Sequence, residues 1–249
     1  MKKILIIGIG AGDPDFITVQ AIKALNTVDV FFVLEKGAAK DAMVELRREL
    51  CRRHAKDRAW RSVEAPSPPR ELRPADYAAC VDELNRIKQE AFERLIGAEL
   101  GEGQIGAVLA WGDPSLYDST IRNIDAIAAR QGLEYEVIPG ISAIQVLAAR
   151  HRITLNTIGQ PVEITTGRRL AEGWPVGVDS VVVMLDGEDT YRRFTGEDID
   201  VYWGAYLGTP DEILIAGQLG AVADEIHRVR TAERQAKGWI MDTYLLRRR

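Results

Sequence analysis

Short apolar runs alternate with helical segments along the first half of the chain. Glycine, proline or charged residues close these runs, which cover residues 3–7, 28–34, 60–63, 107–111 and 133–139. Runs of this length are typical of strands buried on both faces of a parallel sheet. Between them, apolar residues recur at helical spacing over residues 18–26, 38–56, 76–99, 119–131 and 143–150. This β-α alternation predicts an N-terminal α/β domain with a parallel, doubly wound sheet.

The second half of the chain has a different pattern. Strands are predicted at residues 162–166, 180–185 and 201–207, with residues 239–245 as a further candidate. Helices are predicted around 187–195 and at either 210–216 or 220–235. We therefore expect a second α/β domain, with a mixed sheet, and a break between residues 117 and 135. The predicted domains are 1–118 and 119–249, and residues 134–150 could pack with either.

Composition and charge narrow the class of protein. With 249 residues, 46% apolar and 28% charged, the chain is ordinary for a globular protein. No apolar run reaches the length of a membrane span, and residues 4–7 are too short for a signal-peptide core. A net charge of −5 provides no basic field for nucleic acid. Cys51 and Cys80 are expected to be free thiols, which is typical of a cytoplasmic protein. From these features together we expect a cytoplasmic protein that binds neither membrane nor nucleic acid.

One tripeptide occurs after two of the predicted strands, as Gly12-Asp13-Pro14 and as Gly112-Asp113-Pro114. Glycine allows a ligand to approach the backbone closely, and proline ends a strand because it has no N–H for the ladder. In open α/β sheets, ligands bind just outside the carboxyl ends of the strands. The two loops are therefore predicted to converge on a cofactor site.

The glycines at residues 8, 10 and 12 invite comparison with the dinucleotide fingerprint Gly-x-Gly-x-x-Gly. Asp13 stands where the last glycine is needed, and its charge would repel a pyrophosphate. Glu35, at the end of the second strand, could still bind a ribose hydroxyl. A nucleoside without phosphates therefore suits these residues better than a dinucleotide. A dinucleotide-dependent oxidoreductase is the alternative from another class.

Three motifs resemble the signatures of the tetrapyrrole (corrin/porphyrin) methyltransferase family. They are Gly-x-Gly-x-Gly-Asp-Pro at residues 8–14, Gly-Asp-Pro-x-x-Tyr at 112–117 and Pro-Gly-Ile-Ser-Ala at 139–143. They occur in the family's order, although Ala11 stands where many members have proline. Segments of the second half, at 159–169, 183–187, 202–211 and 238–244, resemble a member from the oxygen-dependent cobalamin pathway.

The resemblance implies a two-domain enzyme, usually a homodimer, that binds S-adenosylmethionine in the cleft between its domains and needs no metal. The product of the cofactor would be S-adenosylhomocysteine. The implied reaction methylates C-1 of precorrin-5 and releases acetate, with another precorrin ring position or a diphthamide-type protein methylation as alternatives. A tetrapyrrole-carrying binding protein is the non-catalytic alternative. Carried over by position, the cofactor contacts are Gly10, Ala11, Trp111, Gly112, Asp113, Leu116, Ser142, Ala143, Met184, Leu185, Thr209 and Pro210.

Methyl transfer mainly requires alignment, whereas acetate release also needs a base and a donor to the developing oxyanion. Glu35, Asp113 and Tyr117 are the candidate catalytic residues, since all three follow predicted strands. Asp113 has a second interpretation, which we favour: an Asx-type hydrogen bond that fixes its loop. Glu35 could be either a sugar ligand or a base.

The remaining candidates concern charge and metal binding. A precorrin carries many carboxylates, so a protein with a net negative charge needs local cations to bind it. The predicted substrate-binding cations are Lys36, Arg168 and Arg169, and Arg122 is a lower-ranked candidate. Solvated surface charge is an equally good explanation for each. The histidines at 54, 151 and 227 are isolated along the chain, so no metal site is expected. His151 either complements a helix C-terminus or acts as an acid/base. The proline-rich segment 65–74 is either a lid or slack chain.

Overall fold

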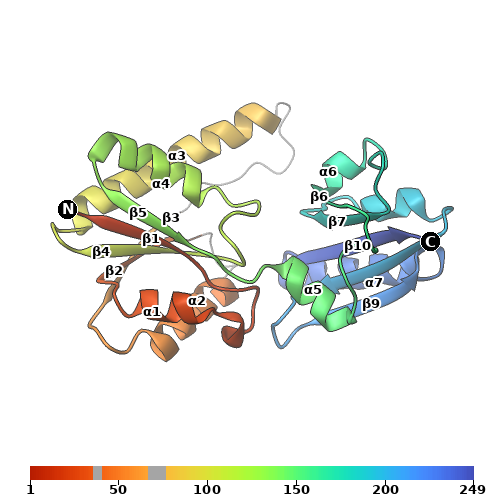
Figure 1. Cartoon of the computed structure of the whole chain (residues 1–249), viewed down its shortest axis with the longest axis horizontal. Helices are drawn as coiled ribbons and strands as arrows, with labels where there is room; N and C mark the ends of the chain where they lie inside the picture. The colour runs from red at the N-terminus through yellow and green to blue at the C-terminus, as the bar shows by residue number, and fades with distance from the viewer. Residues whose placement is uncertain (36–40, 67–76) are drawn as a thin grey trace. The chain divides into compact units, whose positions relative to one another are not determined.

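The computed structural model describes residues 1–35, 41–66 and 77–249. The chain divides into two compact units, Met1–Ser142 and Ala143–Arg249, each built around its own five-stranded sheet. Figure 1 shows the strands and helices of each unit. Within the described part of the chain, we find no helix that combines the length and the apolar character needed to cross a bilayer.

The first unit has a parallel sheet, as predicted. The strands are β1 (Lys3–Gly8), β2 (Val30–Glu35), β3 (Arg61–Pro66), β4 (Ile105–Ala110) and β5 (Glu134–Ile138). Their order is β3-β2-β4-β1-β5, and every neighbouring pair is parallel. The apolar runs of the sequence therefore correspond to strands covered on both faces.

Helices cover both faces of this sheet because side chains alternate along each strand (Figure 1). Helices α1 (Val19–Leu25) and α2 (Asp41–His54) share one apolar cluster with Leu5 and Ile7 of β1. Helices α3 (Tyr77–Glu99) and α4 (Thr120–Gln131) share another with Ile4 and Ile6. The helices that follow β1 and β2 thus lie on one face, and those that follow β3 and β4 lie on the other.

This arrangement creates three positions of the kind where ligands bind in doubly wound sheets. Such positions lie between adjacent strands whose following helices run to opposite faces. In the order β3-β2-β4-β1-β5, the pairs β3/β2, β2/β4 and β4/β1 meet this condition. The carboxyl ends of these strands are therefore the expected places for sites in this unit.

The second unit has a mixed sheet, also as predicted. Its order is β6-β7-β10-β8-β9, and only β6 and β7 are parallel among its neighbouring strands. Helix α5 (Ala143–His151) contacts β8, β9 and β10. The short helix α6 (Gly167–Leu170), the 3-10 turn η3 (Thr190–Phe194) and helix α7 (Leu219–Lys237) contribute to one core cluster with the sheet. The strands are β6 (Val162–Thr166), β7 (Ser180–Met184), β8 (Ile199–Ala205), β9 (Ile213–Gln218) and β10 (Asp242–Arg248).

Several element boundaries differ from the prediction. Residues 213–218 form strand β9 rather than the helix offered at 210–216, while 219–237 form the alternative helix, α7. Ile213 and Ile215 pack into the core and Leu214 is exposed, which is the alternation of a strand. The predicted helix at 187–195 is only the 3-10 turn η3.

The compact units divide at Ser142 rather than after residue 118. Helix α4 packs against α3, and β5 pairs with β1, so residues 119–142 belong with the first sheet. The segment 134–150, left open by the sequence, is split between the units: β5 completes the first sheet and α5 packs on the second.

Candidate functional site

The loops that follow β1 and β4 meet through their main chains, as the repeated Gly-Asp-Pro tripeptide predicted. Gly10 and Gly112 form an isolated antiparallel bridge, in which Gly10 N–H donates to Gly112 O over 3.2 Å and Gly112 N–H donates to Gly10 O over 2.9 Å. Gly112 has a φ of +66°, a left-handed conformation that glycine adopts without steric cost. The convergence therefore depends on the backbone rather than on side chains.

The loop after β5 joins the same corner through an equally close approach. A Cβ added to Gly140 would collide with the carbonyl oxygen of Gly112 and lie 2.8 Å from the carbonyl carbon of Gly8. A Cβ added to Gly8 would lie 2.5 Å from the nitrogen of Gly140. We call Gly8, Gly10, Gly112 and Gly140 the glycine corner. It lies at the carboxyl ends of β4, β1 and β5, at the β4/β1 position expected from the topology.

The two aspartates make the same local turn. Asp13 Oδ1 accepts the N–H of Asp15 over 2.9 Å, and Asp113 Oδ1 accepts the N–H of Ser115 over 2.8 Å. Asp113 does more, since its Oδ2 accepts the N–H of Gly140 over 2.8 Å and so ties the β5 loop to the β4 loop. These bonds support the interpretation of Asp113 as the residue that shapes its loop.

The electrostatics of Asp113 agree with that role. Burial acts to raise the pKa of the Asp113 carboxyl, but the hydrogen bonds from Ser115 and Gly140 outweigh it and hold the pKa below its ordinary value. The carboxylate is therefore ionised at neutral pH, and both of its oxygens are engaged. A group so committed is a weak proton acceptor.

The other residues of the first unit that were predicted to contact the cofactor or the substrate are near the glycine corner along the chain. Ala11 and Ser142 are buried, and Trp111 and Leu116 are partly buried. Tyr117 is 46% exposed and has a φ of +53°, which is uncommon for a bulky residue. An exposed ring on a left-handed backbone is the kind of strain that collects at binding sites.

Two predicted residues and one predicted segment lie partly or wholly outside the described residues. Glu35 is the last residue of β2, but its side chain is not among the described ones, and neither is any part of Lys36. Strand β3 extends to Pro66, and the rest of the proline-rich segment falls outside the described ranges.

In the second unit, the predicted Met184 and Leu185 lie where β7 ends. Leu185 is 61% exposed and has a φ of +54°, so an apolar side chain is presented to solvent from a strained backbone. The next residue, Asp186, is buried and accepts hydrogen bonds from the N–H of Thr190 and the hydroxyl of Tyr244, both over 2.7 Å. Asp186 thus anchors the turn that exposes Leu185.

A buried ion pair extends this anchor, and sequence reasoning missed it. The guanidinium of Arg230 on α7, 2% exposed, donates from Nε to Asp242 Oδ2 over 2.7 Å and also bonds the main-chain oxygen of Asp186. Asp242 also accepts the indole N–H of Trp203 over 2.8 Å. A signal existed in the sequence: Arg230 follows Ala223 and Ile226 at helical spacing, on the apolar face of α7.

The remaining predicted contacts of the second unit are dispersed within it. Ala143 is the first residue of α5. The hydroxyl of Thr209 donates to the carbonyl of Tyr206 over 2.7 Å, and Pro210 is exposed in the same turn. Arg168 and Arg169 are both exposed on α6, where Arg169 pairs with Glu172 over 2.5 Å.

His151 has a local partner that explains its position. It is the last residue of α5, and its Nε2 donates to the carbonyl of Trp203 over 3.0 Å. Burial lowers the pKa of His151 from its ordinary value and outweighs the opposing effect of that hydrogen bond. A neutral ring fits this site, so His151 does not complement the helix C-terminus as a cation.

The cysteines are free thiols, as predicted. Cys51 is buried in the first unit, and burial raises its pKa to about 12. A thiol of this kind is a structural group and a poor nucleophile.

Comparisons with known proteins add to this geometry. Residues 3–223 match the family model described as Tetrapyrrole (Corrin/Porphyrin) Methylases. The chain is 50% identical, over 100% of its length and 96% of the relative's, to a precorrin-6A synthase [deacetylating] of Sinorhizobium sp.. It is 26% identical to the uroporphyrinogen-III C-methyltransferase of Bacillus subtilis, over 74% of this chain and 66% of the relative.

Solved structures agree in fold. A Corynebacterium diphtheriae protein described as related to cobalamin synthesis superposes with a TM-score of 0.84 at 34% identity, covering 99% of this chain and 98% of that one. A uroporphyrin-III C-methyltransferase of Thermus thermophilus, solved with S-adenosylhomocysteine, has a TM-score of 0.56 at 16% identity, covering 98% and 91%. With the family model spanning most of the chain and the converging loops at its strand ends, the chain belongs to the tetrapyrrole (corrin/porphyrin) methylase family.

Proposed function

We propose that the chain is an S-adenosylmethionine-dependent C-methyltransferase of corrin synthesis. It methylates C-1 of precorrin-5 and releases acetate to give precorrin-6A, and it works as a homodimer in the cytoplasm. The observation that carries this proposal is the 50% identity, over the whole chain, to a relative named precorrin-6A synthase [deacetylating]. The family membership supports the wider assignment to methyl transfer on tetrapyrroles.

The glycine corner fits the proposed methyl donor. S-adenosylmethionine is a nucleoside without phosphates, so it needs shape and neutral main-chain groups rather than a helix N-terminus. The corner offers closely packed backbone, and Asp13 beside it carries a charge that disfavours phosphate. We assign the first-unit contacts to Gly10, Ala11, Trp111, Gly112, Leu116 and Ser142, with Asp113 holding the loop. The second-unit contacts proposed are Ala143, Met184, Leu185, Thr209 and Pro210.

Within this proposal, positioning provides most of the rate of methyl transfer. Aligning the methyl donor and the ring carbon can lower a barrier by ~7–11 kcal/mol. The closely packed main chain of the glycine corner suits this purpose, because a surface without mobile side chains holds a ligand with little loss of side-chain entropy. No nucleophilic Ser or Cys is required, since the donor carries its own leaving group.

Acetate release needs a proton acceptor to activate water. The structure makes the predicted bases differ in how well each could accept a proton. Asp113 has both carboxylate oxygens bound to N–H groups and a lowered pKa, so it is the weakest of the predicted bases. We therefore assign the base to Glu35 and hydrogen-bond donation to the exposed Tyr117. Lys36, Arg168 and Arg169 stay proposed as cations for the substrate's carboxylates.

The experiment is an incubation of the purified protein with precorrin-5 and S-adenosylmethionine labelled in its methyl group. We expect a labelled ring and free acetate in equal amounts. Labelled ring without acetate would instead indicate methylation at another ring position, and no labelled ring would refute the assignment. Glu35→Gln should retain methyl-donor binding and lose acetate release, whereas Glu64→Gln, on the neighbouring strand β3, serves as the matched control.

A further inference from the structure

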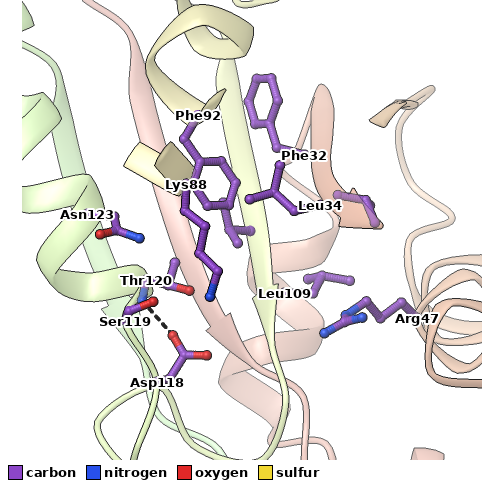
Figure 2. A pocket seen from close by; sticks show the side chains of 12 residues that line it. Phe32, Leu34, Arg47, Lys88, Phe92, Leu109, Asp118, Ser119, Thr120 and Asn123 are labelled. Carbon is purple, nitrogen blue, oxygen red and sulfur yellow. Dashed lines mark hydrogen bonds between the residues drawn. The ribbon is translucent and has the colours of Figure 1, made fainter. Parts of the chain in front are cut away.

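A pocket of the first unit opens where β2 and β4 separate (Figure 2). The two strands are paired only at Val30–Gly106 and Phe31–Ala107, although β2 pairs with β3 along its whole length. Beyond those pairs, residues 32–34 of β2 and 108–109 of β4 line a cavity of about 80 Å³. This pocket lies at β2/β4, another of the positions at which the topology predicts a ligand.

The polar side of the pocket is the beginning of α4. Ser119, Thr120 and Asn123 line it, and Asp118 Oδ1 accepts the N–H of Thr120 over 2.6 Å. The Ser119 side chain makes no capping bond to the helix. The positive end of the α4 dipole thus faces the pocket, which favours an anion there.

Asn123 supplies an independent sign of a ligand. Its side chain is 2% exposed, it lines the pocket, and its Nδ2 has no hydrogen-bond partner among the described residues. Buried N–H groups are rarely left unpaired, because the lost hydrogen bond is costly. Figure 2 shows the amide nitrogen of Asn123 turned toward the side chain of Lys88. An acceptor atom placed in the cavity would satisfy this donor.

The charged side chains around the pocket indicate which kind of ligand carries that acceptor atom. Arg47 of α2 and Lys88 of α3 extend toward Asp118 from different sides (Figure 2). Burial lowers the pKa of the Arg47 guanidinium from its ordinary value, and the nearby charge of Asp118 opposes that shift. Cationic head groups that reach the pocket from two helices suit an anionic ligand.

The walls of the pocket are apolar. Phe32 and Leu34 of β2, Phe92 of α3 and Val108 of β4 line the space beside the charged groups. The matching ligand is a carboxylate on a short aliphatic chain, whose methylene groups contact the walls and whose oxygens accept from Asn123 and the cations. A phosphate has no apolar part to contact these walls.

We propose that this pocket binds one carboxylate side chain, an acetate or a propionate, of the tetrapyrrole substrate. The identity of the substrate rests on the proposed function, whereas the binding of a short-chain carboxylate does not. The loop that ends at Asp118 begins at Gly112 of the glycine corner, so the same loop would serve both the methyl donor and the substrate.

A spectroscopic titration tests the pocket without turnover. The side-chain amide of Asn123 is assigned in 15N–1H spectra of the full chain by its absence in Asn123→Ala. Sodium propionate should shift this resonance, and the shift should weaken in Arg47→Gln but not in Arg130→Gln, which removes the same charge elsewhere. A larger shift with inorganic phosphate than with propionate would overturn the carboxylate assignment. No shift with either anion would overturn the site.

Kinetics test the link to the substrate. Asn123→Asp and Arg47→Gln should raise the KM for precorrin-5 by about ten- to a hundredfold, because each loses a hydrogen bond to a charged group. The KM for the methyl donor should not change. Asp118→Asn should lower the KM for precorrin-5, since asparagine can still cap α4 while one repulsive charge is removed. A propionate shift combined with unchanged KM values would refute the substrate assignment, and a wild-type protein without turnover would refute only the proposed function.

Discussion

The glycine corner makes a specific prediction for Gly140→Ala. The added methyl group would collide with the carbonyl oxygen of Gly112 and approach the main chain of Gly8 to within 2.8 Å. Because backbone atoms of two other loops form the obstacle, no side-chain rotation can relieve the collision. Overpacking costs about 1–3 kcal/mol in ordinary cores, and this site should lie near the upper end.

The assay has to account for the two compact units. Differential scanning calorimetry can resolve separate unfolding transitions, so the loss can be assigned to the first unit. A loss of about 3 kcal/mol corresponds to a fall of about 6–12 °C in Tm. Since the loops after β1 and β4 must also move apart, isothermal titration calorimetry should show weaker binding of S-adenosylmethionine.

Gly97→Ala is the matched control. Gly97 lies in α3 and an added Cβ would meet no atom within 4 Å beyond the helix's own backbone. Alanine favours the helix over glycine, so this variant should gain about 0.5–1 kcal/mol. If Gly140→Ala melted at the wild-type temperature and bound the donor normally, the close approach of the three loops would not be what shapes the corner.

Other substitutions test the residues that hold the loops. Asp113→Asn leaves one oxygen for the N–H groups of Ser115 and Gly140, so the unfolding free energy should fall by about 1–3 kcal/mol at pH 7. Because the folded pKa of Asp113 is lowered, this deficit should persist above the unfolded pKa of about 3.9 and vanish as the pH falls through the folded value, which urea unfolding across pH can check. Leu185→Asn should keep or raise Tm, since asparagine tolerates a left-handed backbone, but weaken donor binding in calorimetry; unchanged binding would count against the contact. Arg230→Met leaves Asp242 buried without its counter-charge and should cost about 3–5 kcal/mol in urea unfolding, a loss that wild-type stability would contradict.

Much of the fold follows from local pattern. The strands of the first unit are short apolar runs, and the intervening helices have an apolar stripe, so their order along the chain predicts a parallel sheet. Parallel strands bring their carboxyl ends to one edge, which is why the repeated tripeptide at residues 12–14 and 112–114 predicted a meeting of loops that the Gly10–Gly112 bridge confirms.

What the sequence did not reveal depends on contacts between distant segments. The helix predicted at 210–216 is strand β9 because a short apolar run does not by itself distinguish a strand from a helix. The link of Asp186 to Arg230 joins residues far apart in the chain. The pocket beside Asn123 exists because β2 and β4 stop pairing after Phe31, and no local pattern records where two strands part.

The non-glycine residues in left-handed conformations connect these observations. Among the described residues they are Tyr117, Arg152, Leu185, Asp189 and Tyr206. Tyr117, Leu185 and Tyr206 all lie in loops just after strands, namely β4, β7 and β8, in segments proposed to contact the methyl donor. Such conformations cost roughly 1–2 kcal/mol per residue, so neighbouring contacts must hold them.

Each of these loops has a visible anchor. Asp113 fixes the loop that contains Tyr117, and Asp186 with Tyr244 fixes the turn at Leu185. Tyr206 is held by two hydrogen bonds of 2.8 Å. Its main-chain N–H donates to the carbonyl of Met241, and its hydroxyl donates to the carbonyl of Trp239. Relaxed turns could join these elements at lower cost in free energy. The strain therefore supports the proposal that the loops are shaped for a ligand rather than for the stability of the fold alone.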